Sequence, residues 1–567
     1  MYLTCGQVSP IHPARAVFRG ARYSRYDVKR GTKPQYLSRL PEHPNFEDLK
    51  KQAKDLLRQY QANDPAAFHR FRESLPAAGG LDDAAIASLG LKLDDARSVI
   101  AREYGKPSWR NLRNYVDWRS SKLSSARQDA VPLWLHNVYG HDHDRPRPDL
   151  AAMALAERPD LGQGDLMLAC ATGDEAAVSA AIAADPARVH RLGNPWICAG
   201  CKLSLAMPPL VAVTHSTLLQ LPQFRDKMQR CARLLLAAGA DPNQSVEHNG
   251  HPLSALYGAA GKNHDADLTR LLLGAGANPN DGESLYHSME TRELECARLL
   301  LEAGAQVEGS NALHHQLDSD NLPGLLLLLQ YTKDVNDRSS TIGSPLIWAI
   351  RRGRSRAHVE ALLAAGADPH AKTKDGVSAY RFALESGLPE VADALASAGA
   401  AEELSWQDQF VAACARSDRA EALRIRVEHP DVFSQLSQTQ LRQLPNLTEA
   451  GKHAAVRLMV ELGWPIAVQG GDWKATALNL AVFQGNAGLA RFLLEQGASW
   501  KEPHGFGDNV NGTLSWASRN QPTENGDWVA CARALVEHGM PILELEGHYS
   551  DQVTAFLAQA RDQLKSR

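Results

Sequence analysis

The only CxxC pair of the chain lies in the stretch NPWICAGCK, where two residues separate Cys198 from Cys201. Thiols at this spacing can face one metal ion, and a tetrahedral zinc site needs four nitrogen or sulfur ligands, usually supplied by two such pairs. There is no second CxxC, although His190, His215 or Cys231 could complete a ligand set in the folded chain. Zinc binding, redox chemistry and ordinary loop cysteines are all open. We interpret the pair as loop cysteines, with Cys198 and Cys201 as weak metal candidates.

Two further stretches hold reactive residue types without the context that their chemistry requires. YGHDHDRPRPD contains His141, Asp142, His143 and Asp144, but adjacent loop residues rarely converge on one metal ion. HGFGDNVNG, at residues 504–512, is glycine-rich, yet a phosphate-binding loop needs a preceding strand and a lysine or helix start after it. Neither GxSxG nor HExxH occurs. We therefore expect no catalytic residue, no metal, no cofactor and no enzyme activity.

Length and charge narrow the class of protein. The chain has 567 residues, more than one compact core usually holds, so several domains or a repeat array are expected. A net charge of −4 gives no global field that would attract nucleic acid or an anionic membrane. The longest apolar run, around Leu325–Leu329, is too short to cross a bilayer, and no secretory segment follows Met1. We expect no membrane partner.

The cysteines indicate a reducing compartment. Eight in so long a chain are too sparse for a disulfide scaffold, and Cys231, Cys296 and Cys531 all follow the same pattern, CARLLL or CARALV. A cysteine on the apolar stripe of a recurring helix behaves as a small hydrophobic residue. We predict a cytoplasmic protein, or one exported as an unfolded or already reduced chain.

These residues are carried by a repeated element. RLLLGAGA returns as RLLLEAGA with Gly276 and Gly304 28 residues apart, and related phrases end at Gly239, Gly366 and Gly497. Each unit predicts a short first helix, a tight turn and a second helix with apolar residues at i, i+3 and i+4. The closing glycine can take the left-handed conformation that ends a helix. One such pair cannot bury its apolar faces alone, so the units must stack.

The period near 33 residues, the xPLxxA helix start and the LLxxGADPN ending resemble the ankyrin repeat. The resemblance covers roughly residues 165–545, about eleven units, with an irregular twelfth at 131–160. It implies an all-α ankyrin-repeat solenoid of eleven to twelve helix-turn-helix units. The family's structural histidine is kept at His314, whereas Ile347 and Asn479 replace it, and we expect weaker local order at those two units.

The segment before the array is also helical. In FEDLKKQAKDLLRQY, Leu49, Leu56 and Tyr60 fall on one face of an amphipathic helix. In the following LDDARSVIAREYGKPSW, Asp94 is a predicted N-cap and Gly105 a helix stop. The pattern LKKQAKDLL…VIAREYG…SW resembles an N-terminal segment found before ankyrin repeats in many bacterial proteins. The resemblance implies a bacterial origin and a small helical cap on the stack.

The domain layout follows from these boundaries. Residues 1–40 carry eight Lys or Arg against one acid, Asp27, and form a basic arm that could contact an anionic partner, be a solvated tail, or be translated leader. A helical cap at 41–125 precedes one ankyrin block at 130–400, with a loop insertion at about 190–230. A second block at 401–545 has an irregular joint at about 430–455, which should separate two cooperative blocks and permit a bend. A capping helix is expected at 546–567.

The resemblance also implies where a partner binds, because finger tips and the ends of first helices line the concave face of ankyrin stacks. Six of the eleven tryptophans follow residue 400, and tryptophan and arginine dominate interface energetics. We interpret Trp473 as a contact residue and Trp516 as core. A cluster at Arg351, Arg352, Arg354 and Arg356 could grip an acidic surface or phosphate, or be a solvated face. The partner-binding candidates are Trp473, Phe483, Gln484, Arg351, Arg352, Lys374, Asp375, Glu385 and Arg519.

The sequence thus predicts a non-catalytic scaffold or adaptor that binds another protein through its concave finger and inner-helix surface. The alternative is a bacterial effector or a zinc-stapled module that acts through the N-terminal third or the Cys198/Cys201 insertion. Nucleic acid is not an expected partner apart from weak contact by the arm at 1–40. The two units between Gly276 and Thr332, which end at Gly304 and Thr332, leave room only for tight turns, so we expect a notch in the row of fingers.

Overall fold

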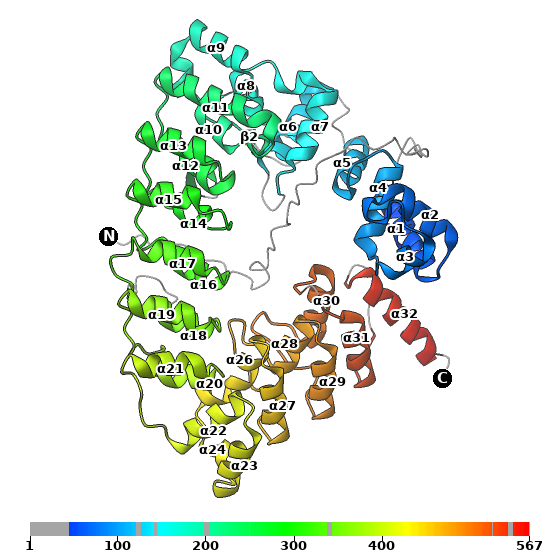
Figure 1. The fold of residues 1–567 in the computed structure, drawn as a ribbon, viewed down its shortest axis with the longest axis vertical. Coiled ribbons are helices and arrows are strands. Elements are labelled where there is room, and N and C mark those ends of the chain that lie inside the picture. The colour runs from blue at the N-terminus through cyan, green and yellow to red at the C-terminus, as the bar shows by residue number, and fades with distance from the viewer. Residues whose placement is uncertain are drawn as a thin grey trace. The chain divides into compact units, whose positions relative to one another are not determined.

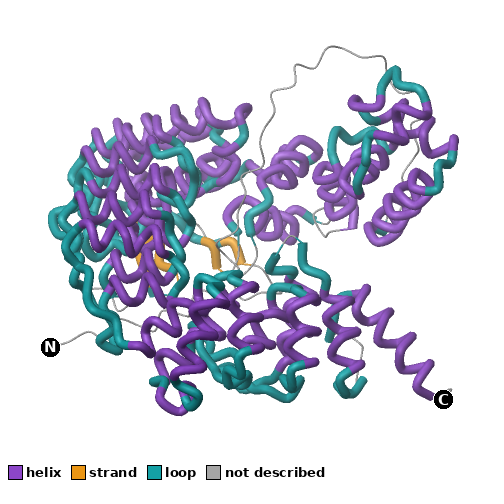
Figure 2. The backbone as a smooth tube through the Cα atoms, turned by 60° about the horizontal axis from the view of Figure 1, so that its bottom comes forward, coloured by secondary structure: helices purple, strands orange, loops and turns teal. Residues whose placement is uncertain are grey.

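A computed structural model describes residues 45–120, 126–140, 145–193, 195–197, 204–248, 250–336, 343–523, 525–542 and 548–565. The chain divides into two compact units, an N-terminal unit that ends at Ala305 and a C-terminal unit that begins at Gln306. Helices make up nearly all regular structure in both (Figures 1 and 2). No helix in the described part of the chain is both long enough and apolar enough to cross a membrane.

The N-terminal unit begins with a small helical bundle whose core forms from regularly spaced apolar residues. Leu49, Leu56 and Tyr60 of α1 are buried, and the Tyr60 hydroxyl donates to the Ile86 carbonyl at 3.0 Å. The helices of the bundle are α1 (Phe46–Gln61), α2 (Pro65–Ser74), α3 (Asp83–Ser88), α4 (Leu93–Glu103) and α5 (Trp109–Ser120), with a 3₁₀ turn at Pro76–Ala78.

The start of α4 differs from the sequence prediction. The helix begins at Leu93 with Lys92 as N-cap, so Asp94 is not the cap residue. The Asp95 carboxylate accepts the Lys92 N–H at 2.8 Å, which satisfies a backbone donor that the helix leaves unpaired. Gly105 follows the helix at φ +71° and ends it as expected.

Helix pairs follow the bundle, and α5 packs against the second helix of the first pair. The fourth pair begins with a short α-helix that continues as a π-helical turn at Gly258–Lys262. The pairs are α6 (Arg127–Tyr139) with α7 (Pro148–Glu157), α8 (Leu166–Thr172) with α9 (Glu175–Ala184), α10 (Pro209–His215) with α11 (Pro222–Ala237), α12 (Ala255–Tyr257) with α13 (Ala266–Gly274), and α14 (Ser284–Ser288) with α15 (Glu295–Glu302). Short 3₁₀ segments lie at Pro159–Gly162, Pro186–His190 and Thr217–Gln220.

The loop insertion expected at about 190–230 is mostly a regular repeat, so that prediction was wrong. Helix α10 starts at MPPLVAV, which has the proline-leucine start of the other units, and α11 continues as the second helix of the pair. Residues 191–207 are the true addition, and they contain a hairpin of β1 (Trp196–Ile197) and β2 (Ser204–Leu205). A second hairpin, β3 (Ser245–His248) with β4 (His251–Ser254), forms the finger of the next unit.

The C-terminal unit contains seven further pairs of the same kind, stacked through their first and second helices. The first helices of the pairs are called inner helices below and the second ones outer helices. The pairs are α16 (Ala312–Asp318) with α17 (Leu322–Leu329), α18 (Pro345–Arg351) with α19 (Arg356–Ala364), α20 (Ala379–Glu385) with α21 (Pro389–Ser397), α22 (Trp406–Ala415) with α23 (Arg419–Glu428), α26 (Gln443–Glu449) with α27 (His453–Glu461), α28 (Ala477–Phe483) with α29 (Ala487–Glu495), and α30 (Val510–Asn520) with α31 (Trp528–Glu537).

Polar contacts near the helix starts show how two units keep their order despite different residues. In α16, His314 Nε2 contacts the Gly343 carbonyl at 2.9 Å. In α28, Asn479 takes that role: its side-chain amide donates to the Glu502 carbonyl at 3.2 Å and accepts from the Thr513 hydroxyl at 2.8 Å. The expectation that Asn479 weakens local order was therefore wrong, because its amide, like the ring of His314, bonds to the segment that leads into the next inner helix.

The irregular joint is packed rather than loose. Two short helices, α24 (Val432–Gln435) and α25 (Gln438–Leu441), replace a finger and lead into α26. One continuous core runs from Phe410 to Leu557 through this segment, and the Trp464 indole N–H donates to the Leu441 carbonyl at 2.9 Å. The expected block boundary at residue 400 is thus not where the structure divides, because buried contacts continue across it and the division falls at Ala305.

The unit closes with α32 (Asp551–Lys565), which packs on α31 through the buried Val553 and Leu557. Cysteines recur in the buried stripes of both units. Five are described, all buried and free: Cys170, Cys231, Cys296, Cys414 and Cys531. Burial raises the pKa of each thiol, to about 12 for Cys414 and Cys531, so these side chains behave as small apolar groups.

Candidate functional site

Five aromatic side chains from two neighbouring repeats meet on the inner face of the C-terminal unit. The Trp473 ring lies 5.6 Å from Phe483, 5.3 Å from His504 and 6.3 Å from Phe506, measured between ring centroids. Phe483 also stacks on Trp516 at 5.6 Å with an interplanar angle of 10°. We call these five residues the aromatic cluster. Offset and edge contacts of this kind are favourable arrangements for aromatic rings.

Two fingers and two inner helices position the cluster. Trp473 lies in the finger closed by the bridge between Gly470 and Ala475, and His504 and Phe506 lie in the next finger. The Gly505 N–H donates to the Trp473 carbonyl at 2.8 Å and links the two fingers directly. A Cβ at Gly505 would lie 2.8 Å from that carbonyl oxygen, so only glycine allows this approach.

The cluster is exposed on one side and anchored on the other. Phe506 has 58% of its surface exposed, whereas Trp473, Phe483 and Trp516 are half-buried. The His504 ring is buried, and this burial lowers its pKa, so the ring is neutral at pH 7. Trp516 differs from its predicted role as a core residue, because its ring packs on the core and also extends the surface cluster through Phe483.

A group of ion pairs lies beside the cluster. Asp472, next to Trp473, binds Arg351 of α18 across 121 residues of sequence, and Arg352 Nη1 approaches its second carboxylate oxygen at 3.7 Å. Arg352 Nε also donates to Asp318 at 2.7 Å. The two guanidinium groups lie 5.4 and 4.3 Å from the centroid of the Trp348 ring, the contact distance of cation–π pairs. The predicted arginine cluster is therefore already paired with acids of its own chain.

Glu385, a candidate for partner contact, lies inside the unit with only 1% of its surface exposed. It faces Asp408 of α22 and Gln443 of α26, and Arg381 Nε lies 3.7 Å from one of its oxygens. Burial, opposed by Arg381 and reinforced by the Asp408 charge, raises the Glu385 pKa to about 7. The prediction of a surface role was wrong, because the helices of the joint close over this end of α20.

Gln484 is also used internally. Its side-chain amide donates to the carbonyls of Thr448 and Glu449 at 3.0 and 3.2 Å, which satisfies the end of α26. Since α26 has no finger, Gln484 supplies a link that holds α28 against it.

The remaining partner candidates are solvent-exposed. Lys374 and Asp375 occupy the tip of the finger at residues 372–378, and Arg519 lies near the end of α30 with its Nε donating to the Ser515 carbonyl at 3.3 Å. Their roles in binding stay predictions.

The chemically reactive stretches do not add a second site among the described residues. Cys198, Cys201, residues 141–144 and the arm at 1–40 lie outside the part of the chain that the structure describes. Within that part, no group of three or more His, Cys, Asp or Glu side chains is placed to hold a metal ion.

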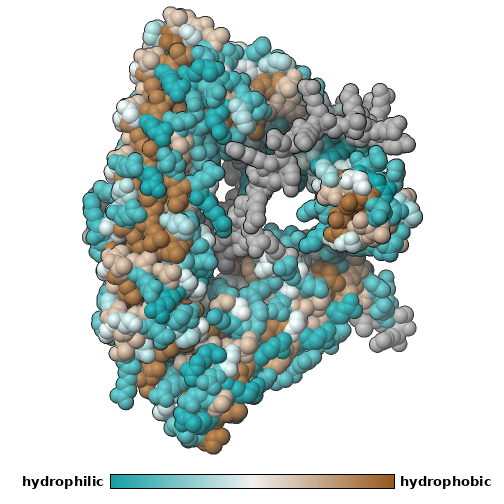
Figure 3. Space-filling model, in the orientation of Figure 1, coloured by the Kyte–Doolittle hydropathy of each residue, from teal (hydrophilic) through white to brown (hydrophobic). Residues whose placement is uncertain are grey.

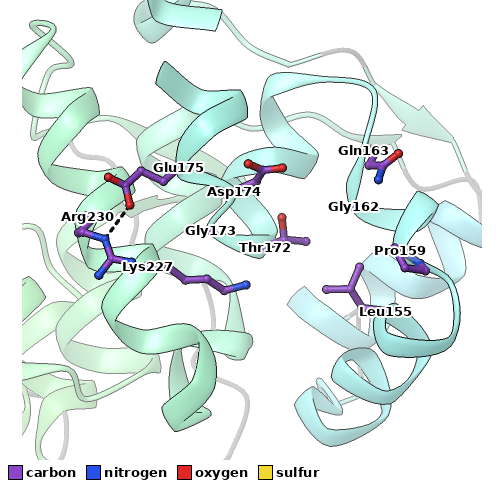
Figure 4. A pocket seen from close by; sticks show the side chains of 10 residues that line it. All are labelled: Leu155, Pro159, Gly162, Gln163, Thr172, Gly173, Asp174, Glu175, Lys227 and Arg230. Atoms are coloured by element: carbon purple, nitrogen blue, oxygen red, sulfur yellow. Dashed lines mark hydrogen bonds and ion pairs between the residues drawn. The ribbon is translucent and has the colours of Figure 1, made fainter. Parts of the chain in front are cut away.

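One open pocket of about 460 Å³ lies in the N-terminal unit, beside the turn between α8 and α9 (Figure 4). Arg230 Nε binds Glu175 at 2.6 Å, and the Lys227 side chain points toward Leu155 on the far side of the pocket (Figure 4). Burial lowers the Lys227 pKa, and Asp174 counters that shift. The pocket walls are mixed, and the charges that line it are largely balanced among themselves, so they do not select a ligand.

A second aromatic row lies on the inner helices of the N-terminal unit. The Tyr257 ring lies 5.7 Å from His215 and 5.2 Å from His287. His215 is buried, and this burial together with the charge of Lys262 lowers its pKa to about 3. Burial alone would lower the His287 pKa, but hydrogen bonds at 3.1 Å to Glu283 and Glu290 outweigh it and raise the pKa to about 9.

Comparison with known proteins agrees with the repeat. A family model described as ankyrin repeats (3 copies) matches residues 256–339. Among solved structures, the human ASB11 ankyrin repeat domain is 21% identical and aligns over 40% of this chain and 98% of its own, with a TM-score of 0.20. The ankyrin repeat domain of Bcl-3, described as a unique member of the IkappaB protein family, is 20% identical over 44% and 99%, with a TM-score of 0.21. No curated protein matches the chain.

The family match supports ankyrin repeats at residues 256–339, and the described residues on either side form helix pairs of the same kind. Ankyrin repeats are generally protein-interaction modules, and nothing in the comparisons shows an enzymatic domain.

Proposed function

We propose that the protein is a non-catalytic adaptor that binds a partner protein on the inner face of its C-terminal unit, with the aromatic cluster as the anchor. The observation that supports this proposal is the stacking of Trp473 on the exposed Phe506, with Phe483 in tilted contact with the same Trp473 ring, where two fingers meet. Large rings held rigidly at a surface lose little conformational entropy on binding, and such residues dominate measured interfaces.

The apolar surface on the outer side of the unit is a weaker candidate. Apolar side chains reach the surface over the outer helices α17 to α21 (Figure 3), and Leu326 of α17 is 46% exposed. These are aliphatic side chains between regularly spaced helices, and single exposed aliphatic residues are normal on protein surfaces. The aromatic cluster, in contrast, combines five rings in one place.

The buried free thiols fit a reducing setting, so we place the adaptor in the cytoplasm. The N-terminal unit contributes repeats of its own, and we infer that it offers a separate surface. Its aromatic row has no ring as exposed as Phe506, and two carboxylates engage His287, so we place the anchor in the C-terminal unit.

The test is a selection of binding peptides from a random display library on the full chain, followed by affinity measurements on variants. Phe506→Ala should weaken binding of the selected peptides by about 2 kcal/mol, the loss typical of a hot spot, and leave the melting temperature unchanged. Val427→Ala is the matched control, because Val427 is 77% exposed on the outer helix α23. Equal losses in the two variants, or none in Phe506→Ala, would refute the proposed site.

A further inference from the structure

The ion pairs beside the aromatic cluster indicate what kind of segment the inner face binds. This inference rests on the proposed function and adds the partner's chemistry. Asp472 places a carboxylate on Arg351 and Arg352 immediately before Trp473 in the chain. In this structure the finger itself supplies the carboxylate that the two arginines bind, and an aromatic residue follows that carboxylate in the chain. A partner segment with the same order of side chains would fit the same surface.

Both arginines have contacts besides Asp472 that fix their positions. Arg352 is held by Asp318, which also accepts the Trp348 indole N–H at 3.0 Å, and both guanidinium groups lie against the Trp348 ring. A cation so fixed is preorganised for a carboxylate that arrives from another molecule, because little side-chain freedom is lost on binding.

Asp472 can be displaced at small cost. The side chains of Arg351 and Asp472 are 44% and 35% exposed, and solvent-exposed ion pairs contribute little to stability. Displacement leaves Asp472 in water, while the incoming carboxylate takes the two donors that it vacates. The finger would then lose its link to α18, while Trp473 keeps its ring contacts with Phe483, His504 and Phe506 and faces the incoming segment.

We propose that the C-terminal unit binds an acidic segment of a partner protein, in which a carboxylate replaces Asp472 at Arg351 and Arg352 and an adjoining aromatic side chain packs on Trp473 and Phe506. Arginines beside exposed rings also suit single-stranded nucleic acid. The surrounding acids favour the protein segment, because Asp318 and Glu449 flank the same arginines and would repel a continuous run of phosphates.

The test uses the full chain and two fluorescein-labelled peptides, one with a phenylalanine flanked by glutamates and one in which glutamines replace the glutamates. The acidic peptide should bind more tightly, and Arg351→Ala should weaken it about fivefold without affecting the glutamine peptide. Asp472→Asn removes the internal competitor and should tighten the acidic peptide about fivefold, a gain that should vanish in the Arg351→Ala/Asp472→Asn double variant. Arg356→Ala and Glu360→Gln, an exposed ion pair on α19, are the matched controls and should change neither peptide.

The outcomes separate this inference from the proposed function. If both peptides bind equally and both depend on Phe506, the aromatic site stands and the acidic specificity is refuted. Weaker binding of the acidic peptide to Asp472→Asn would show that Asp472 only supports the finger, and would overturn the inference as well. Displacement of the acidic peptide by oligouridylate at similar concentration would replace it with a nucleic-acid site. Absence of binding by either peptide, while library-selected peptides bind in a Phe506-dependent way, would overturn the inference and leave the proposed function standing.

Discussion

The N-terminal unit carries a row of aromatic side chains on its inner helices, and the C-terminal unit carries the aromatic cluster on two fingers and two inner helices. The two groups differ in what surrounds them. In the N-terminal unit, His215 is buried and His287 is clamped between two carboxylates. In the C-terminal unit, Trp473 and Phe506 contact mainly other rings, and Phe506 is exposed. The repeat determines the positions at which aromatic side chains occur. The residues around them determine whether these side chains stabilise the fold or remain accessible to another molecule.

The largest effect should come from a buried tryptophan of the C-terminal unit. Trp464 is 3% exposed and donates to the Leu441 carbonyl, so Trp464→Ala should lower the free energy of unfolding by roughly 3–5 kcal/mol. Trp473→Ala should lower it by less than about 1 kcal/mol, because most of its ring faces other surface rings. Denaturant unfolding measures both. Similar losses would show that Trp473 is structural and that the contrast between the two groups does not hold.

The next effect is a pH dependence of the C-terminal unit. Glu385 has a pKa near 4.5 when unfolded and about 7 when folded, so the folded state retains its proton longer as pH rises. Stability should therefore fall between about pH 4.5 and 7, by about 3 kcal/mol if the full shift is realised. Glu385→Gln should remove this dependence. Hydrogen exchange of peptides from α20, α22 and α26 measures it, and an unchanged pH profile in the variant would assign the effect to another group.

A smaller dependence should appear in the N-terminal unit at higher pH. His287 has a pKa raised to about 9 by Glu283 and Glu290, so its contribution is complete below about pH 6.5 and is lost as pH rises through 9. The loss should be smaller than that of Glu385, because the His287 side chain is 27% exposed. His287→Gln should flatten this part of the profile only. If both units lost stability in the same pH range, Glu385 and His287 would not be the groups that set the two pH dependences.

The smallest effect concerns the contact between fingers. Gly505→Ala should push the finger away from the Trp473 carbonyl and weaken peptide binding a few-fold, with a stability loss of about 1 kcal/mol or less. Gly507→Ala in the same finger is a control for backbone strain alone, because Gly507 has φ +78° but nothing near its added Cβ. Binding affinity by fluorescence anisotropy should fall more in the first variant than in the second.

Much of the fold could be predicted from the sequence because the same helix-turn-helix pattern recurs many times along the chain. The leucine periodicity and the closing glycines predicted the positions of the helix pairs. The expectation of weaker local order at Asn479 was wrong, but it did not affect the predicted fold. The site was less accessible. The repeat register placed Trp473 and Phe483 among the partner-binding candidates, whereas the ion pair of Asp472 with Arg351 joins residues 121 positions apart and has no local signal.

The errors have a common physical cause. Glu385 and Gln484 occupy surface positions in a regular stack, but the joint replaces a finger with α24 and α25 and lets α26 pack directly beside them. A register argument assumes that every unit has the same neighbours, so it fails next to the unit that lacks a finger. His504 and Phe506 lie in a finger, and the finger-to-finger hydrogen bond at Gly505 that brings them to Trp473 could not be predicted from one sequence.

The buried cysteines make it possible to measure the opening of individual repeats from the rates at which their thiols react. Cys170, Cys231, Cys296, Cys414 and Cys531 sit one to a repeat along the chain, and a buried thiol with a raised pKa reacts with an alkylating reagent only when its helix pair opens. With Cys5, Cys198 and Cys201 changed to serine, the five labelling rates would report the opening of five separate repeats. The stability of individual repeats could then be measured one repeat at a time, with native cysteines as the only probes.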